Sequence, residues 1–92
     1  MDQLQFRDYR RRIAMNCYIC GISATPVVLP DIEEILCPEC GRYRITGAAV
    51  ELLKRNILKL DIYLSQRWLA DQQSSGFIPL IDSSIAGKLM QH

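Results

Sequence analysis

Four cysteines are the residues of this sequence best placed to do chemistry together. Cys17 and Cys20 in CYICG, and Cys37 and Cys40 in CPECG, each form a C-x2-C pair, with residues 21–36 between the pairs. A C-x2-C turn lets two sulfurs from one loop reach the same ion, and two such turns complete the tetrahedral shell that Zn²⁺ prefers. The spacing therefore predicts one zinc ion bound by all four cysteines.

The residues around the pairs favour a structural ion over a catalytic one. Gly21 and Gly41 follow the two pairs, where the backbone must turn sharply so that its amides point at sulfur. The ligand set is complete without histidine, and a shell of four thiolates leaves no open position for water or substrate. Iron in the same thiolate geometry is the main alternative. A redox-active dithiol pair is the third interpretation.

No other group of residues forms a catalytic constellation. The sequence contains no glycine-rich phosphate loop, no nucleophile beside a histidine base and no carboxylate pair at a recognisable catalytic spacing. We therefore expect a protein that is not an enzyme.

Length and composition indicate a single soluble domain. The chain has 92 residues, of which 49% are hydrophobic and 23% charged, and a core of this size needs a staple such as a metal ion. The opening MDQLQFRDYRRRIAMN places charges where a secretory signal is apolar, and no apolar run approaches the roughly 18 residues that span a bilayer. We expect a reducing cytoplasm, where four cysteines bind metal rather than form disulfides.

Basic residues form two groups that are candidate surfaces for a protein partner or a nucleic acid. One is N-terminal and the other follows the second cysteine pair: Arg7, Arg10, Arg11 and Arg12, then Arg42, Arg44, Lys54, Arg55 and Lys59. The formal net charge of +1 argues against nucleic-acid binding through net charge alone, although each group can contact phosphates. For the first group, the alternative is a solvated face or ion pairs with Asp31, Glu33 and Glu34.

Three aromatic residues each have two interpretations. Tyr18 and Tyr43 either stack on nucleic-acid bases beside the arginines or pack the small core around the cysteines, and we favour the core. Trp68 belongs either to the core or to a surface that anchors a partner.

The elements that position the cysteines are short. Residues 1–15 predict a basic helix or arm, and residues 16–46 predict two hairpin-like arms that meet at the four sulfurs. Within the second range, ATPVVLP is extended, and GRYRIT alternates apolar and basic residues as a half-buried strand does.

Residues 47–92 predict a helical tail that belongs to the same domain as the rest of the chain, 1–92. Thr46 is the expected N-cap of a helix that runs toward Gln73, with a break near Asn56 or between Asp61 and Ser65. An apolar stripe is expected to fold back on the cysteine-bearing residues 16–46 rather than to dimerise: Val50, Leu53, Ile57, Leu60 and Leu64. FIPLI is short and extended, and Asp82, Ser83 or Ser84 caps a last helix.

CYICG and CPECGRYRIT resemble the knuckles of a zinc ribbon over residues 16–46. More loosely, CPECGRYRITGAA followed by YLSQRWLADQQSSGFIPLI is similar to an N-terminal module of uncharacterised prokaryotic or phage proteins, in which a ribbon precedes a larger effector. The resemblance implies an α+β fold, in which short antiparallel strands with two knuckles precede a helical C-terminal half. We expect no effector activity to carry over, because this chain ends at His92.

These observations together predict a non-enzymatic zinc-binding protein that acts as a protein–protein binding module. The hypothesis is an adaptor or inhibitor of a larger nucleic-acid-handling complex, of the size common among phage and mobile-element proteins. The alternative is a regulator that binds DNA or RNA directly through the two basic groups.

Overall fold

The computed structural model describes residues 15–91 of the chain. Within that range the elements follow one another in this order: β1 (Met15–Asn16), β2 (Ser23–Leu29), β3 (Ile32–Cys37), β4 (Gly41–Thr46), α2 (Gly47–Lys54), α3 (Ile62–Gln73), β5 (Leu80–Ile81) and α4 (Ser83–Lys88). The predicted N-terminal basic group lies outside the described residues: Arg7, Arg10, Arg11 and Arg12. No helix within residues 15–91 is long and apolar enough to cross a membrane.

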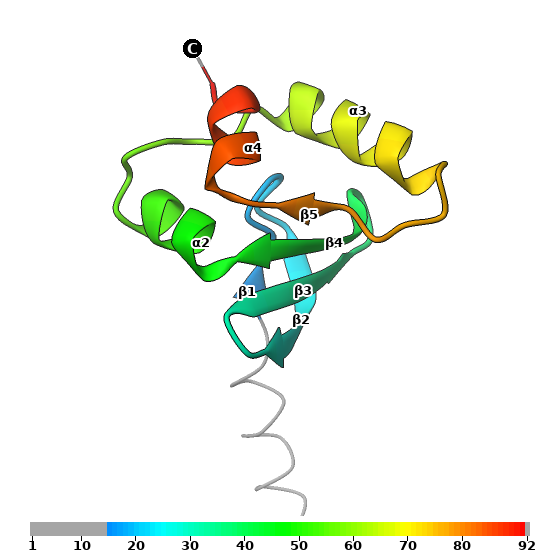
Figure 1. Cartoon of the computed structure of the whole chain (residues 1–92), viewed down its shortest axis with the longest axis horizontal. Coiled ribbons are helices and arrows are strands. Elements are labelled where there is room, and N and C mark those ends of the chain that lie inside the picture. The colour runs from blue at the N-terminus through cyan, green and yellow to red at the C-terminus, as the bar shows by residue number, and fades with distance from the viewer. Residues whose placement is uncertain (1–14, 92) are drawn as a thin grey trace, which may run out of the picture.

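The strands form one five-stranded sheet in the order β1-β2-β3-β4-β5. Neighbouring strands from β1 to β4 are antiparallel, whereas β5 runs parallel to β4. In the view of Figure 1, the helices α3 and α4 lie above β4 and β5, α2 lies to the left at the end of β4, and β2 and β3 lie below. The predicted α+β class is confirmed. FIPLI was expected to be extended, but its pairing with β4 was not anticipated.

The two cysteine turns connect successive antiparallel strands. The first turn, Cys17–Cys20, joins β1 to β2, and the second, Cys37–Cys40, joins β3 to β4. Gly21 and Gly41 follow the turns with φ angles of 82° and 90°, in the left-handed region that glycine enters without strain. The sharp turn expected at these two glycines is confirmed.

The predicted helical segment is divided into two helices, and the division lies near Asn56, one of the two places where a break was expected. Thr46 caps α2 as expected, because its hydroxyl accepts a hydrogen bond from the Ala49 amide. Asn56 has a φ of 58°, and the amides of Asn56 and Ile57 bond back to the carbonyls of Leu53 and Leu52. This is the paired pattern of a Schellman motif, in which a left-handed residue ends a helix. The Asp61 carboxylate caps α3 by accepting from the Leu64 amide.

The break at Asn56 divides the predicted apolar stripe. Val50 and Leu60 are buried in the core, whereas Ile57 and Leu64 are exposed. Leu60 is not helical and instead forms an isolated bridge with Met90, next to α4. The prediction of one continuous stripe was therefore wrong, because the left-handed residue changes the direction of the chain between the two helices.

A single core joins the sheet to the helices. Ile35, Tyr43 and Ile45 from β3 and β4 are fully buried, and so are Leu69 of α3 and Ile81 of β5. Three of the four cysteines belong to the same cluster of buried side chains. The cysteines therefore pack within the same core as the sheet and the helices.

Candidate metal centre

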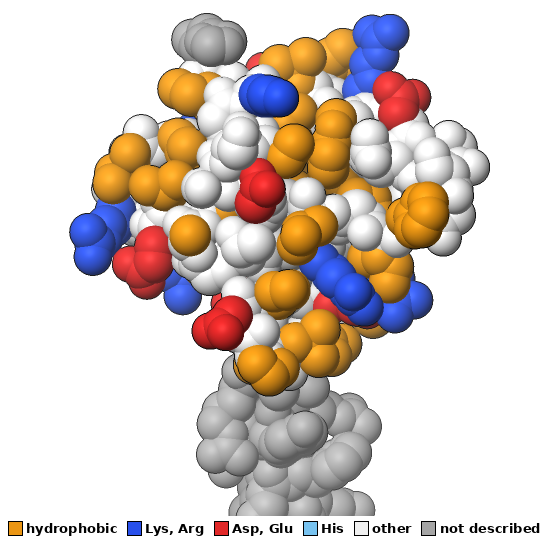
Figure 2. All heavy atoms as spheres, viewed as in Figure 1, with side chains coloured by type: hydrophobic (Ala, Val, Ile, Leu, Met, Phe, Trp, Pro, Cys, Tyr) orange, Lys and Arg blue, Asp and Glu red, His pale blue; other side chains and the backbone are white. Residues whose placement is uncertain are grey.

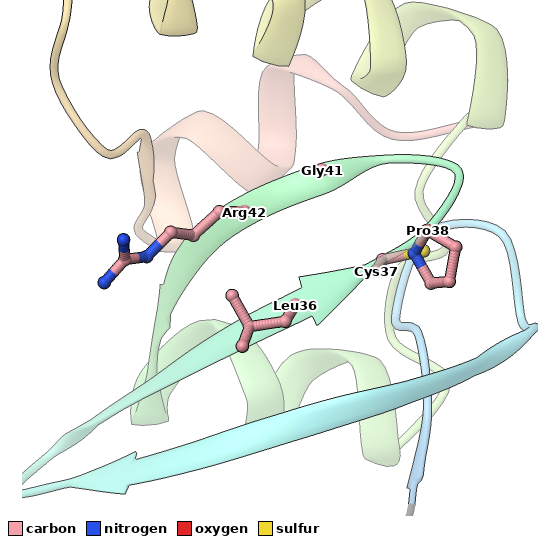
Figure 3. A pocket seen from close by; sticks show the side chains of 5 residues that line it. All are labelled: Leu36, Cys37, Pro38, Gly41 and Arg42. Carbon is pink, nitrogen blue, oxygen red and sulfur yellow. The ribbon is translucent and has the colours of Figure 1, made fainter.

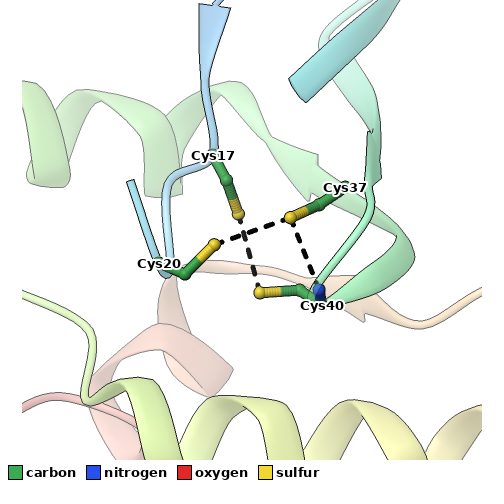
Figure 4. Close-up of side chains that lie close together, drawn as sticks. All are labelled: Cys17, Cys20, Cys37 and Cys40. Atoms are coloured by element: carbon green, nitrogen blue, oxygen red, sulfur yellow. Dashed lines mark hydrogen bonds between the residues drawn. The ribbon is translucent and has the colours of Figure 1, made fainter. Parts of the chain in front are cut away.

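The four cysteine sulfurs lie together at the point where the two turns meet. All four Sγ atoms are within 4.8 Å of one another, and three of the four cysteines are buried (Figure 4). The Sγ atoms of Cys17 and Cys40 are 3.8 Å apart, and those of Cys20 and Cys37 are 3.6 Å apart. A disulfide needs an S–S distance of about 2.05 Å, so none of these cysteines is paired as a disulfide.

These separations fit a shared metal ion. In a tetrahedral thiolate shell with metal–sulfur bonds of about 2.3 Å, neighbouring sulfurs are about 3.8 Å apart. The two measured sulfur–sulfur distances of 3.6 and 3.8 Å are close to that value. Two backbone amides also point at the sulfurs: the Ile19 amide lies 3.4 Å from Cys17 Sγ, and the Cys40 amide lies 3.4 Å from Cys37 Sγ. The four cysteines therefore form a site that could hold a metal ion.

Two side chains outside the cysteine turns also contact the sulfurs. The Tyr43 hydroxyl is 3.3 Å from Cys17 Sγ, and it accepts a hydrogen bond from the Tyr18 amide at 3.3 Å. Because the hydroxyl oxygen accepts from that amide, its proton is free to be donated to the sulfur. Gln66 of α3 donates its side-chain amide to Cys40 Sγ at 3.4 Å. Such outer contacts orient metal ligands and reduce the charge that each thiolate carries.

The thiols differ in how readily they ionise. Burial acts to raise the pKa of Cys17, but hydrogen bonds from the Tyr43 hydroxyl and from nearby backbone amides outweigh it and lower that pKa to about 7. Burial raises the pKa of both Cys20 and Cys40. Several thiolates can therefore share this volume only when a cation neutralises them, and metal binding releases their protons.

The structure divides the second basic group among different environments. Arg42 and Arg44 both pair with Glu34, and Arg55, the C-cap of α2, pairs with Glu51 one turn earlier in that helix. Lys54 and Lys59 lie beside a hollow of about 290 Å³ between Tyr18 and the α2–α3 connection. On the face shown in Figure 2, basic side chains are dispersed among hydrophobic and acidic ones instead of forming one patch.

Tyr18 and Tyr43 follow the favoured interpretation, in which they pack against the core. Tyr43 is fully buried, and Tyr18 is partly buried with its hydroxyl donating to Glu33 Oε1 at 2.7 Å. Burial, followed by this hydrogen bond and the charge of Glu33, raises the pKa of Tyr18. Trp68 is partly buried against the core.

The contacts of three residues were not predicted from the sequence. Tyr43 was assigned to the core but not to a sulfur contact, although its alternation on β4 places it on the buried side. Gln66 is 26 positions from Cys40, and no local pattern signals their contact. Glu34 was considered as a partner for the N-terminal arginines, whereas the described partners are Arg42 and Arg44.

Comparisons of the chain with protein-family models, with curated proteins and with solved structures find no match. The functional argument therefore depends on the geometry and chemistry of the residues themselves.

Proposed function

We propose that the four cysteines hold one structural zinc ion. The observation that carries this proposal is the position of four thiols within 4.8 Å of one another, with two sulfur–sulfur distances close to the edge of a tetrahedral shell. Zinc suits four thiolates in tetrahedral geometry, has no redox chemistry of its own and needs no fifth ligand. Iron is the competing ion for the same donors.

The ion's role in this proposal is to tie the two turns together. The first turn carries Cys17 and Cys20 between β1 and β2, and the second carries Cys37 and Cys40 between β3 and β4. These turns are far apart in the sequence, and a shared ion bonds both to one centre. Structural zinc contributes about 10 to 16 kcal/mol of apparent binding energy in small domains, so folding and metal binding are expected to be coupled here.

The zinc-held domain is, in this proposal, a protein-binding module and not an enzyme. It acts as an adaptor or inhibitor that docks on a larger nucleic-acid-handling complex, of the kind that phages and mobile elements encode. Exposed hydrophobic side chains on the sheet support a protein partner, and so do arginines that are already paired with Glu34. Fixed arginines beside apolar side chains are typical of protein interfaces.

Metal analysis of the purified protein tests the first part of the proposal. Protein produced without added metal and analysed by inductively coupled plasma mass spectrometry is expected to contain one zinc per chain. The Cys37→Ser variant is expected to lose it, and Glu39→Ala, in the same turn, is expected to keep it. One iron per chain, or a metal-free folded protein, would contradict structural zinc.

Direct binding of DNA or RNA is the second candidate function, and one observation favours it. Lys54 and Lys59 lie at the same hollow as the partly buried Tyr18, so two cations and an aromatic side chain are close together. This candidate predicts binding to generic duplex or single-stranded nucleic acid that weakens steeply between low and physiological salt. It also predicts that Lys54→Ala with Lys59→Ala weakens binding, while Lys88→Ala, on α4, does not. Absent or salt-insensitive binding would remove this candidate.

A further inference from the structure

One face of the sheet carries a mixed set of charged and apolar side chains. Residues paired across neighbouring strands project to the same side, and the strand register therefore determines which side chains share a face. Glu34 pairs with both Val27 and Arg44, and Arg44 pairs in turn with Leu80 on β5. The next row contains the Leu36–Arg42 pair. We call this surface the outer face, and its six side chains are Val27, Glu34, Leu36, Arg42, Arg44 and Leu80.

Glu34 is buried on this face because two arginines cover it. Only 5% of Glu34 is exposed. Arg42 places its Nε 2.7 Å and its Nη2 2.6 Å from Oε2, and Arg44 places its Nε 2.9 Å from Oε1. Both carboxylate oxygens are thus engaged by charge-assisted hydrogen bonds, which are the stronger kind.

The triad of Arg42, Glu34 and Arg44 carries a net charge of +1, because the carboxylate of Glu34 neutralises only one of the two guanidinium groups. Two guanidinium groups face one carboxylate, and within residues 15–91 no other acceptor engages Arg42 Nη1 or the two terminal nitrogens of Arg44. Glu34 also fixes the two side chains in place. A partner that binds them therefore pays less conformational entropy than it would for free arginines.

Apolar side chains surround the triad. Val27, Leu36 and Leu80 are each 41% exposed, on three different strands. Figure 3 shows Leu36 and Arg42 projecting from β3 and β4, with Pro38 in the second cysteine turn. These three residues line an open hollow of about 340 Å³. The fixed positive charge is thus bordered by apolar surface on several sides.

From this arrangement we infer that the outer face is a docking site for a protein segment that presents a carboxylate between apolar side chains. The carboxylate binds the guanidinium nitrogens of Arg42 and Arg44 that Glu34 does not engage, and the apolar side chains cover Leu36, Leu80 and the hollow beside Pro38. The inference rests on the proposed role as a protein-binding module and specifies the chemistry of the partner.

The chemistry of the face favours a protein over a polynucleotide. A polyanion is bound by a run of unpaired cations that neutralise successive phosphates. The outer face has a surplus of one positive charge, and Val27, Leu36 and Leu80 present no hydrogen-bond donor to a phosphate. An acidic side chain flanked by apolar ones matches both the charge and the surrounding surface.

The test uses a random peptide library displayed on phage and selected on the immobilised, metal-loaded full chain. We expect selected peptides to contain Asp or Glu flanked by Leu, Ile, Val or Phe. An enriched peptide is then synthesised with a fluorescent label, and its Kd is measured by anisotropy. Changing its acidic residue to the matching amide is expected to weaken binding at least about tenfold, which is the effect of one interfacial contact of about 1.4 kcal/mol.

Variants of the protein locate the peptide on the outer face. Arg44→Ala leaves Glu34 paired with Arg42, and Leu80→Ser leaves the whole triad unchanged; each is expected to weaken binding about tenfold. Arg55→Ala is the matched control, because Arg55 pairs with Glu51 on α2 outside this face. Metal content and circular dichroism of each variant show whether it is folded.

The outcomes separate this inference from the proposed function. Peptides without a conserved carboxylate, or a Kd that neither Arg44→Ala nor Leu80→Ser changes, would overturn the docking site while the protein remains a binding module. Failure to select any peptide also overturns the docking site. If the metal-loaded protein in that case also retains no protein from a cell extract, the binding-module proposal fails with it.

Discussion

Two polar clusters lie on opposite sides of strand β4. On the buried side, Tyr43 points at the four sulfurs, and on the outer face its neighbours Arg42 and Arg44 bind Glu34. The sulfur cluster gathers four thiols with no positively charged side chain hydrogen-bonded to them within residues 15–91, whereas in the triad two guanidinium groups face one carboxylate. Under the two proposals above, the first cluster stabilises the fold through a bound ion and the second binds a partner, and the variants below test this difference.

Among substitutions on the two sides of β4, the replacement of one cysteine is expected to have the largest effect on stability and metal binding. Cys37→Ser takes one thiolate from the shell and leaves three buried or partly buried thiols without a complete site. If metal binding and folding are coupled as proposed, metal binding should fall below detection and the free energy of unfolding should drop by more than about 5 kcal/mol. Chemical denaturation with parallel metal analysis measures both quantities.

Glu39→Ala is the matched control for that variant, because Glu39 is exposed in the same turn. It is expected to leave the metal content and the denaturation midpoint unchanged. If Cys37→Ser and Glu39→Ala had the same small effect, the cysteine cluster would not be a structural metal site.

Removing only the hydroxyl of Tyr43 tests the outer contacts of the sulfur cluster. Tyr43→Phe keeps the buried ring but deletes the donor to Cys17 and the acceptor for the Tyr18 amide. We expect a loss of about 1 to 3 kcal/mol in stability and roughly tenfold weaker metal binding. Competition with a chromophoric chelator measures the affinity.

A change in metal–ligand chemistry distinguishes this effect from a simple loss of stability. In the cobalt-substituted protein, the sulfur-to-cobalt charge-transfer band is expected to shift in Tyr43→Phe, because Cys17 then carries more charge. Tyr63→Phe, on the exposed side of α3, is expected to change neither the affinity nor the band. An unshifted band would mean that Tyr43 only packs the core.

The two clusters also differ in how far the sequence predicts them. The cysteine site was predictable because each C-x2-C pair is local, and the chemistry of four thiolates restricts what they can bind. The strands beside it and the Thr46 cap were predictable for the same reason, since alternation and capping are local patterns. In each case, the residues that determine the structure are within a few positions of one another.

The triad and the Gln66 contact could not be predicted in the same way. Glu34 meets Arg42 and Arg44 only in one register of β3 against β4, and shifting it by one residue would place Glu34 on the buried side. Gln66 reaches Cys40 only because the chain turns at Asn56, which also separates α2 from α3. Both contacts depend on tertiary packing that no short stretch of sequence specifies.

Removing one arginine of the triad is expected to lower the stability moderately and to leave the metal affinity unchanged. Arg44→Ala leaves Glu34 Oε1 without its charged donor, and we expect a lower denaturation midpoint than that of the wild type. Metal affinity is expected to be unchanged, because Arg44 projects away from the sulfurs. Denaturation and chelator competition on the same sample measure both. A parallel loss of metal affinity would mean that the two sides of β4 are coupled.

The smallest expected effect is on the ionisation of Glu34. Hydrogen bonds from Arg44 and then Arg42 lower the pKa of Glu34 below its ordinary value of 4.5. A depressed carboxyl pKa stabilises the fold above the ordinary value, and this contribution is lost as the pH falls through the lower, folded-state pKa. Carbon-13 NMR of the Glu34 carboxyl is expected to show a carboxylate that is more than half ionised at pH 4.5.

In Arg44→Ala, protonation of Glu34 should begin at higher pH, because the hydrogen bond from Arg44, the largest cause of the lowered pKa, is gone. A wild-type carboxyl that is half protonated at pH 4.5 would mean that the arginines do not hold its charge, and the outer face would then lose the fixed cations that distinguish it from the sulfur side.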